Sequence, residues 1–201
     1  MTTVAEVGGV LSSTNDPALR ILYFAALLRT EAGLGTDDVV VVGGSAIEVY
    51  TKGAYVSGDI DICAPLGPVV AALEKWEFKR PGREWVRLDW KIVVDLVGVR
   101  PSGSMSLTRI VETPYGPVRL GAVEDLLLGR LALIKFWNEG DEIKNVRLLL
   151  KLPSIDWSYL AFKARKENLE DMLTQLRPDR RRRKGNRPRT NKGSRGRRSS
   201  Q

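Results

Sequence analysis

The chain has 201 residues, 43% of them hydrophobic and 28% charged, with one cysteine and no histidine. This length and composition predict one compact domain with an appendage. The single cysteine excludes an internal disulfide, and the absence of histidine excludes zinc sites and histidine acid–base catalysis. No apolar run approaches the ~18 residues of a membrane span, and the start, MTTVAEVGGVLSSTND, lacks the basic segment of a signal peptide. We therefore expect a cytoplasmic protein without membrane contact.

The net charge of +8 averages over two different segments. Residues 177–201 carry twelve Lys and Arg and one acid, or +11, whereas residues 1–176 carry 20 basic and 23 acidic residues, or −3. The segment from Arg177 to Gln201 has no aliphatic or aromatic side chain, so it cannot offset the entropy of folding and is predicted to be a disordered tail. Its charge density predicts nonspecific binding to nucleic acid or another polyanion, with a merely solubilising tail as the alternative.

The first predicted element is a helix over the sequence ALRILYFAALLRTEAG. Asp16 is the expected cap, Pro17 suits the first helical position, and Gly33 is the expected stop. An apolar stripe along this helix predicts that it packs on a sheet. The stripe consists of Leu19, Leu22, Tyr23, Ala26 and Leu27.

Residues 39–62 read VVVVGGSAIEVYTKGAYVSGDIDI and contain the first chemical motif. The four valines predict a buried strand, which a glycine-rich turn ends. Gly43 and Gly44 let the backbone turn sharply and come close to a phosphate. Ser45 is placed to cap a short helix over AIEVYTK, and the free N–H groups at that helix start favour an anion.

The second strand, GDIDICA, carries Asp59 and Asp61 on one face, because side chains alternate along a strand. Two acids that point the same way repel each other unless a cation lies between them, which favours Mg²⁺. Asp95, alone among apolar neighbours in KIVVDLVG, is the expected third carboxylate. Asp89 is the alternative, although it lies where a turn is predicted.

Each of these features also has a purely structural interpretation. A Gly-Gly-Ser turn is often only a turn, a D-x-D pair is often a solvated strand face, and an isolated strand Asp can cap or face solvent. Their succession within one small chain instead favours a site for metal-dependent phosphoryl or nucleotidyl transfer.

The order of these motifs resembles the signature of the nucleotidyltransferase superfamily that includes DNA polymerase beta. That signature is a hydrophobic residue, Gly and Gly or Ser, followed by D-h-[DE]-h. Here Gly44-Ser45 is separated by 13 residues from Asp59-Ile60-Asp61-Ile62. The resemblance covers residues 39 to about 97, and it implies that Gly44 and Ser45 hold a triphosphate.

By the same resemblance, Asp59 and Asp61 would bind two Mg²⁺ ions, and Asp95 would be the third carboxylate, which activates the attacking hydroxyl. The later stretch VRLGAVEDLLLGRLALIKFW is similar to small stand-alone prokaryotic members, including relatives of abortive-infection toxins. That likeness implies a possible antitoxin partner, which one chain cannot identify. The oligomeric state stays open.

The segment after the second strand predicts a helix over APLGPVVAALEKW and strands on either side of Pro81-Gly82. Cys63 is expected to be a buried small hydrophobe, with a reactive thiol as the alternative. Basic residues alternate with aromatic ones between Trp76 and Lys91. They fit either a nucleic-acid surface or, as we prefer, a solvated strand face with inward aromatics.

The last third of the folded part is predicted to contain two short strands in LTRIVETPYGPVRL and then helices. The strongest helix runs from Glu124 to Trp137, and Lys135 continues its apolar stripe through Leu128 and Leu131. This lysine either extends to water or reaches an anion in the cleft, where it would join Gly43, Gly44 and Ser45 in nucleotide binding. Two more helices are expected before Leu176, with Asp156 as a cap.

Together these inferences predict an α/β (α+β) nucleotidyltransferase fold with a small mixed sheet in residues 36–120, a helical part in 121–176 and the basic tail in 177–201. The expected activity is Mg²⁺-dependent transfer of a nucleoside monophosphate from an NTP to a hydroxyl, with release of pyrophosphate. An RNA end, a protein and a small molecule all remain open as acceptors. The alternative is an inactive family member that binds nucleic acid through its tail.

Overall fold

The computed structural model describes residues 3–177, and the predicted tail from 178 onward lies outside the described residues. Within that range the fold is mixed α and β, with one six-stranded sheet and eight α-helices. None of these helices is long and apolar enough to cross a membrane.

The six strands of the sheet are β1 (Val40–Val41), β2 (Ile60–Cys63), β3 (Trp85–Arg87), β4 (Ile92–Gly98), β5 (Arg109–Val111) and β6 (Val118–Leu120). Their order in the sheet is β3-β4-β2-β1-β6-β5, with parallel and antiparallel pairs mixed. The central strand β2 pairs in parallel with β4 and antiparallel with β1, and β1 is parallel to β6. The two edge strands β3 and β5 pair antiparallel with their neighbours.

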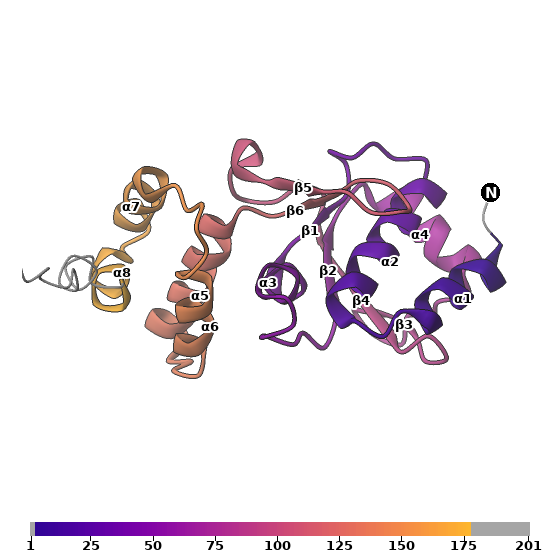
Figure 1. Cartoon of the computed structure of the whole chain (residues 1–201), viewed down its shortest axis with the longest axis horizontal. Coiled ribbons are helices and arrows are strands. Elements are labelled where there is room, and N and C mark those ends of the chain that lie inside the picture. Colours follow the sequence, from indigo (N-terminus) through magenta and orange to yellow (C-terminus); the bar gives the residue numbers. More distant parts are fainter. Residues whose placement is uncertain (1–2, 178–201) are drawn as a thin grey trace, which may run out of the picture.

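The helices fall into two groups. In the first part of the chain they are α1 (Val4–Ser13), α2 (Pro17–Glu31), α3 (Gly43–Thr51) and α4 (Leu66–Lys75). In the second part they are α5 (Val123–Trp137), α6 (Glu142–Leu149), α7 (Trp157–Lys166) and α8 (Glu170–Leu176), and a short 3₁₀ turn, Met105–Leu107, precedes β5. Helices α1, α2 and α4 cover one side of the sheet, whereas α5 to α8 form the opposite end of the molecule and α3 lies between the two parts (Figure 1).

Two hydrophobic clusters hold these parts together. The larger joins the sheet to α1, α2 and α4, with Phe24, Trp76 and Trp90 among its buried side chains. The smaller joins α5 to α8 and includes Ile47 of α3. Since α3 contributes to both clusters through Ala46 and Ile47, the helical part packs against the helix that begins at the glycine-rich turn.

Several sequence predictions are confirmed at residue level. Asp16 caps α2 by accepting from the Ala18 N–H at 2.9 Å, and Asp156 caps α7 by accepting from the Ser158 N–H at 2.9 Å. Free Cys63 is buried. The aromatic side chains between 76 and 90 also pack inward.

Other predictions are wrong. Leu19 of the expected α2 stripe is 40% exposed, and the C-terminal part contains three helices after α5 rather than two. The sequence patterns also did not predict α1, although Thr3 and Glu6 form a reciprocal capping box at its start. Helix α1 is rich in Val and Gly, which are weak helix formers. Its two fully buried residues, Val7 and Leu11, are buried by contacts that form only in the folded chain.

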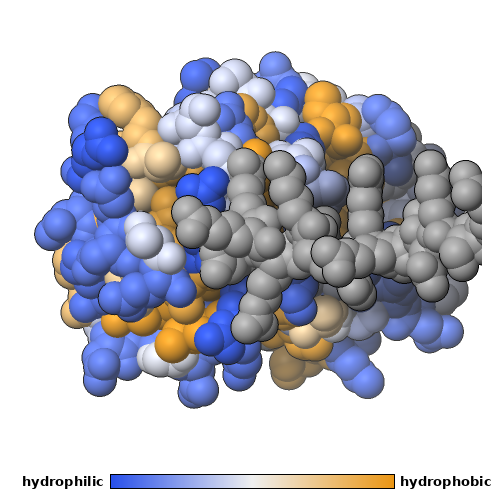
Figure 2. Space-filling model, turned by 60° about the vertical axis from the view of Figure 1, so that its left-hand side comes forward, coloured by the Kyte–Doolittle hydropathy of each residue, from blue (hydrophilic) through white to orange (hydrophobic). Residues whose placement is uncertain are grey.

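In the view of Figure 2, which brings the helical end forward, hydrophilic surface predominates and apolar surface is divided into separate patches. Exposed apolar residues of this end include Phe136, Trp137 and Phe162.

Candidate active site

Three carboxylates meet at the end of the central strands. Asp61 of β2 is the register partner of Asp95 on β4, and Asp59 immediately precedes β2. One oxygen from each acid lies within 4.8 Å of the others. Ile60 and Ile62, which alternate with these acids, are buried in the core on the other face of the strand. The structure thus brings together the three acids that the sequence predicted.

The three acids repel one another at a site where Asp95 is buried and Asp59 and Asp61 are partly buried. Burial raises the pKa of Asp61 to about 6, and the neighbouring charges of Asp59 and Asp95 add to this effect. The Gly44 N–H donates to the Asp61 carboxylate at 2.8 Å and opposes the shift in part. A divalent cation would remove the repulsion, and an all-oxygen donor set of this kind suits Mg²⁺ or Mn²⁺.

Arg83 already supplies a positive charge to one of these acids. Its Nε donates to Asp95 Oδ1 at 3.1 Å, and a second guanidinium nitrogen donates to Oδ2. Asp95 is buried, whereas the Arg83 side chain is 75% exposed and comes from the turn before β3. The sequence contains no signal for this pair, because an arginine in a Pro-Gly turn is ordinarily a solvated residue.

The two glycines before the acids are required by close packing. Gly43 has φ +53°, and a β-carbon there would lie 2.2 Å from an oxygen of Asp61. A β-carbon on Gly44 would lie 2.7 Å from Ser57 Oγ. Both glycines therefore let the N-terminus of α3 come close to Asp61 and Ser57. The close approach to a phosphate that the sequence predicted stays a prediction.

Ser45 has a different role from the expected one. Helix α3 begins at Gly43 with Val42 as its cap residue, so Ser45 lies inside the first turn and does not cap it. The Ser45 hydroxyl is fully buried, donates to the Val42 carbonyl at 3.0 Å and accepts from the Asp61 N–H at 3.0 Å. It ties β2 to α3 and thereby positions Asp61, and its hydroxyl is not exposed to a phosphate.

A cavity of about 580 Å³ opens beside Asp61 and the glycine turn. The loop 100–104 and the part of α5 up to Leu133 form its other walls, and they contribute the basic side chains Arg100 and Arg130. Asp125 fixes this loop by accepting from the Ser104 N–H at 2.8 Å and from the Tyr159 hydroxyl at 2.7 Å. The cavity therefore places two arginines and the N-terminus of α3 around a space that Asp61 borders.

Lys135 does not line this cavity, so the structure does not bring it together with Gly43 and Gly44 as the sequence predicted. Its amino group donates to the Asn168 carbonyl at 2.6 Å and to Asp171 at 2.8 Å. Lys135 lies in the last turn of α5, where the apolar stripe that it continues faces α8. Helical periodicity predicted the correct face of α5 for Lys135, but it could not predict which residues this side chain contacts.

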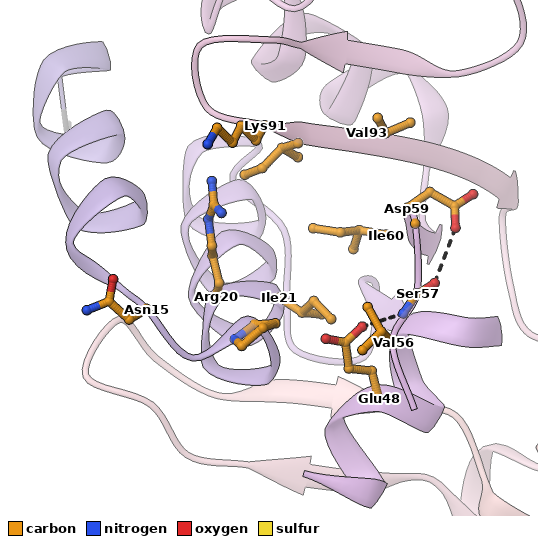
Figure 3. Close-up of a pocket in the computed structure, with 13 residues that line it drawn as sticks. Asn15, Arg20, Ile21, Glu48, Val56, Ser57, Asp59, Ile60, Lys91 and Val93 are labelled. Carbon is orange, nitrogen blue, oxygen red and sulfur yellow. Dashed lines mark hydrogen bonds between the residues drawn. The ribbon is translucent and has the colours of Figure 1, made fainter. Parts of the chain in front are cut away.

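Asp59 is held in place by residues that the sequence analysis did not single out. Buried Glu48 accepts from the Ser57 N–H at 2.6 Å, and the Ser57 hydroxyl donates to Asp59 at 3.3 Å. Figure 3 shows both bonds and shows Ile60 projecting to the opposite side of the strand from Asp59. A glutamate at position 48 inside an otherwise apolar buried helix turn is the one sequence signal that could have indicated this support.

A second cavity, of about 210 Å³, lies on the α2 side of this strand and is bounded by Arg20, Glu48 and Lys91 (Figure 3). The second carboxylate oxygen of Glu48 is buried and has no hydrogen-bond partner among the described residues.

The structure also bears on two alternatives from the sequence, Asp89 as the third acid and Cys63 as a reactive thiol. Asp89 is exposed, pairs with Arg87 and is not part of the acidic cluster. Burial raises the pKa of Cys63 to about 11, so the thiol stays protonated at neutral pH.

No protein-family model matches the chain, and no curated protein sequence matches it. The function of this protein is therefore inferred from its residues and their geometry.

Proposed function

We propose that this protein is a metal-dependent nucleotidyltransferase of the superfamily that its motifs resemble. The observation that supports this most directly is the meeting of Asp59, Asp61 and Asp95 within 4.8 Å, with Asp61 at the wall of a 580 Å³ cavity. The adjacent N-terminus of α3 and the cation Arg100 suit the triphosphate of an NTP. This arrangement supports the nucleotidyltransferase fold as well as the activity.

The reaction would transfer a nucleoside monophosphate to an acceptor hydroxyl. The hydroxyl oxygen forms a bond to the α-phosphorus, the bond from that phosphorus to the bridging oxygen breaks, and pyrophosphate leaves. Asp95, with Asp59 and Asp61, would hold Mg²⁺, and bound Mg²⁺ would supply the positive charge that stabilises the transferring phosphoryl group. Asp95 would also accept the hydroxyl proton.

Gly43 and Gly44 would orient the nucleotide by bringing the backbone of α3 to the site, and Ser45 keeps Asp61 in register with this turn. Asp95 becomes available when Arg83 moves aside, because the guanidinium occupies both carboxylate oxygens. Release of Arg83 is therefore part of loading the site.

The same ion pair favours a second candidate function. If Arg83 permanently neutralises Asp95, the protein is an inactive family member that acts as a nucleic-acid-binding protein through its basic tail. Metal titration separates the two candidates, because only the enzyme binds Mn²⁺ at the acidic cluster with micromolar to millimolar affinity.

Activity is tested by incubating the protein with each labelled NTP and Mg²⁺, together with RNA, cell protein or an aminoglycoside. We expect label on one acceptor class and release of pyrophosphate. Asp59→Ala with Asp61→Ala should reduce labelling by about 100-fold or more, since the metal is the main source of transition-state charge. Asp89→Asn, which alters an exposed acid outside the cluster, is the matched control. Equal labelling by wild type and the double variant would refute the enzyme.

A further inference from the structure

A large groove lies next to the acidic site, between α6 and the loop that comes after α3. Its volume is about 990 Å³, and its walls come from residues 54–56 on one side and 140–151 on the other. Helices α3 and α6 are in contact, so the groove lies at the junction of the sheet part and the helical part.

One wall of this groove carries a row of basic side chains. Lys144, Arg147 and Lys151 are spaced by three and four residues, which places them on one side of α6 and its C-terminal turn. All three are exposed, and none forms an ion pair with any residue in the range 3–177. Asp141 is the one acid among the described residues that line the groove, so within that part of the chain three positive charges face one negative charge.

Tyr55 connects the groove to the acidic site. It lines the groove, and a β-carbon added to Gly44 would come within 3.1 Å of its hydroxyl. The charge of Asp61 is close enough to contribute to the raised pKa of Tyr55, although burial is the larger cause. Tyr55 therefore lies between the groove and the glycine turn, which contacts Asp61.

We propose that this groove binds the sugar–phosphate backbone of a single-stranded nucleic acid and directs its terminal hydroxyl to the acidic site. The inference rests on the proposed function and names its acceptor class. Three cations in a row, unpaired within residues 3–177, match the repeating charge of a phosphate backbone. Tyr55 lies at the part of the groove nearest to the acidic site. A neutral small molecule would gain nothing from the row.

Crosslinking locates the strand directly in the full-length protein. RNA and DNA oligonucleotides of one sequence, each with a photoreactive 4-thio pyrimidine at the 3′ end, are irradiated with the protein and the modified peptides are mapped. We expect crosslinks in residues 54–56 or 140–151 for the sugar type that serves as acceptor. Crosslinks confined to residues 177–201 or to the strands near Lys79 would overturn the proposal.

Charge removal measures the contribution of the row. In the variant Lys144→Gln, Arg147→Gln and Lys151→Gln, the slope of log affinity against log salt should decrease in magnitude by about 2, as expected for three lost contacts to a single strand. The control variant Lys79→Gln, Lys91→Gln and Lys166→Gln removes the same charge from exposed residues outside the groove and should keep the wild-type slope. An unchanged slope in the groove variant would overturn the proposal.

These binding measurements do not depend on catalysis. If the groove variant loses binding while the wild type transfers no nucleotide to any acceptor, the groove is a nucleic-acid site and the proposed enzyme is wrong. If the wild type labels proteins or small molecules and the groove variant does so equally well, the enzyme stands and the acceptor assignment is wrong.

Discussion

Charged side chains are arranged differently in two regions of the molecule. In the C-terminal helices they form pairs of opposite charge, whereas at the acidic site of the sheet like charges lie together. Between those helices, or at their ends, cations are matched by acids: Arg130 pairs with Glu142, Lys135 with Asp171, and Arg165 with Glu170. At the sheet, three carboxylates meet, and the one salt bridge to them within residues 3–177 comes from Arg83.

This difference distinguishes charges that hold the fold from charges kept for a ligand. Paired side chains such as Lys135 join one helix to another, whereas the repulsion among Asp59, Asp61 and Asp95 costs stability unless a cation is bound. Unneutralised charge gathered in one place is therefore the better guide to function than charged residues as such.

The largest expected effect is loss of metal binding when one of the acids is neutralised. Asp61→Asn should weaken Mn²⁺ binding by about 100-fold or more, because the amide keeps the shape but removes the charge at the centre of the cluster. Titration monitored by electron paramagnetic resonance measures the free ion. Asp171→Asn, in the helical part, is the matched control and should bind as the wild type does. Equal affinities for both variants would show that the acidic cluster is not a metal site.

Protons should compete with the metal at the same site. Since the pKa of Asp61 is raised to about 6, Mn²⁺ affinity should be near its maximum above pH 7 and fall by roughly tenfold per pH unit below 6. Isothermal titration between pH 5 and 8 measures this dependence. An affinity independent of pH would show that Asp61 is not a ligand.

The raised pKa of Asp61 also makes the free energy of unfolding depend on pH. An acid paired with a cation stabilises the fold as pH rises, and Asp61 does the reverse. Between pH 4 and 6 native Asp61 keeps a proton that the unfolded chain has lost, so without metal its contribution lowers the free energy of unfolding as pH rises through this window. Asp61→Asn should remove that component, as measured by denaturant unfolding at pH 4 and pH 7. Added Mn²⁺ should stabilise the wild type at pH 7 and leave the variant unaffected.

A smaller change in Mn²⁺ affinity is expected when Arg83, the cation paired with Asp95, is neutralised. Arg83→Gln should tighten Mn²⁺ binding by roughly fivefold, because the metal no longer displaces a guanidinium from Asp95. Arg80→Gln changes a neighbouring exposed arginine and should have no such effect. Weaker metal binding in Arg83→Gln would instead show that the arginine supports the loaded site.

The smallest effect concerns the paired charges of the helical part. Lys135→Gln should lower Tm by about 2–4 °C through loss of its contacts to Asn168 and Asp171, and leave Mn²⁺ affinity unchanged. Thermal unfolding monitored by circular dichroism measures the first quantity. If Lys135→Gln instead changed nucleotide affinity with no effect on Tm, the lysine would belong to the site after all.

The sequence by itself determined the local features of this protein. Alternation along a strand placed Asp59 and Asp61 on one face, an isolated Asp95 in an apolar strand indicated the third acid, and Asp16 and Asp156 were recognisable as caps. These features depend on neighbours within a few residues, so backbone periodicity and side-chain chemistry are enough to predict them.

Only the tertiary structure decided which distant groups those residues meet. Arg83 reaches Asp95 because β3 pairs beside β4, Ser45 is buried because β2 packs on α3, and Lys135 faces α8 instead of the cavity. The row from Lys144 to Lys151 gains significance only because α6 lies along the loop of Tyr55. Contacts of this kind are set by how whole elements pack, and the spacing of residues along the chain carries no record of that packing.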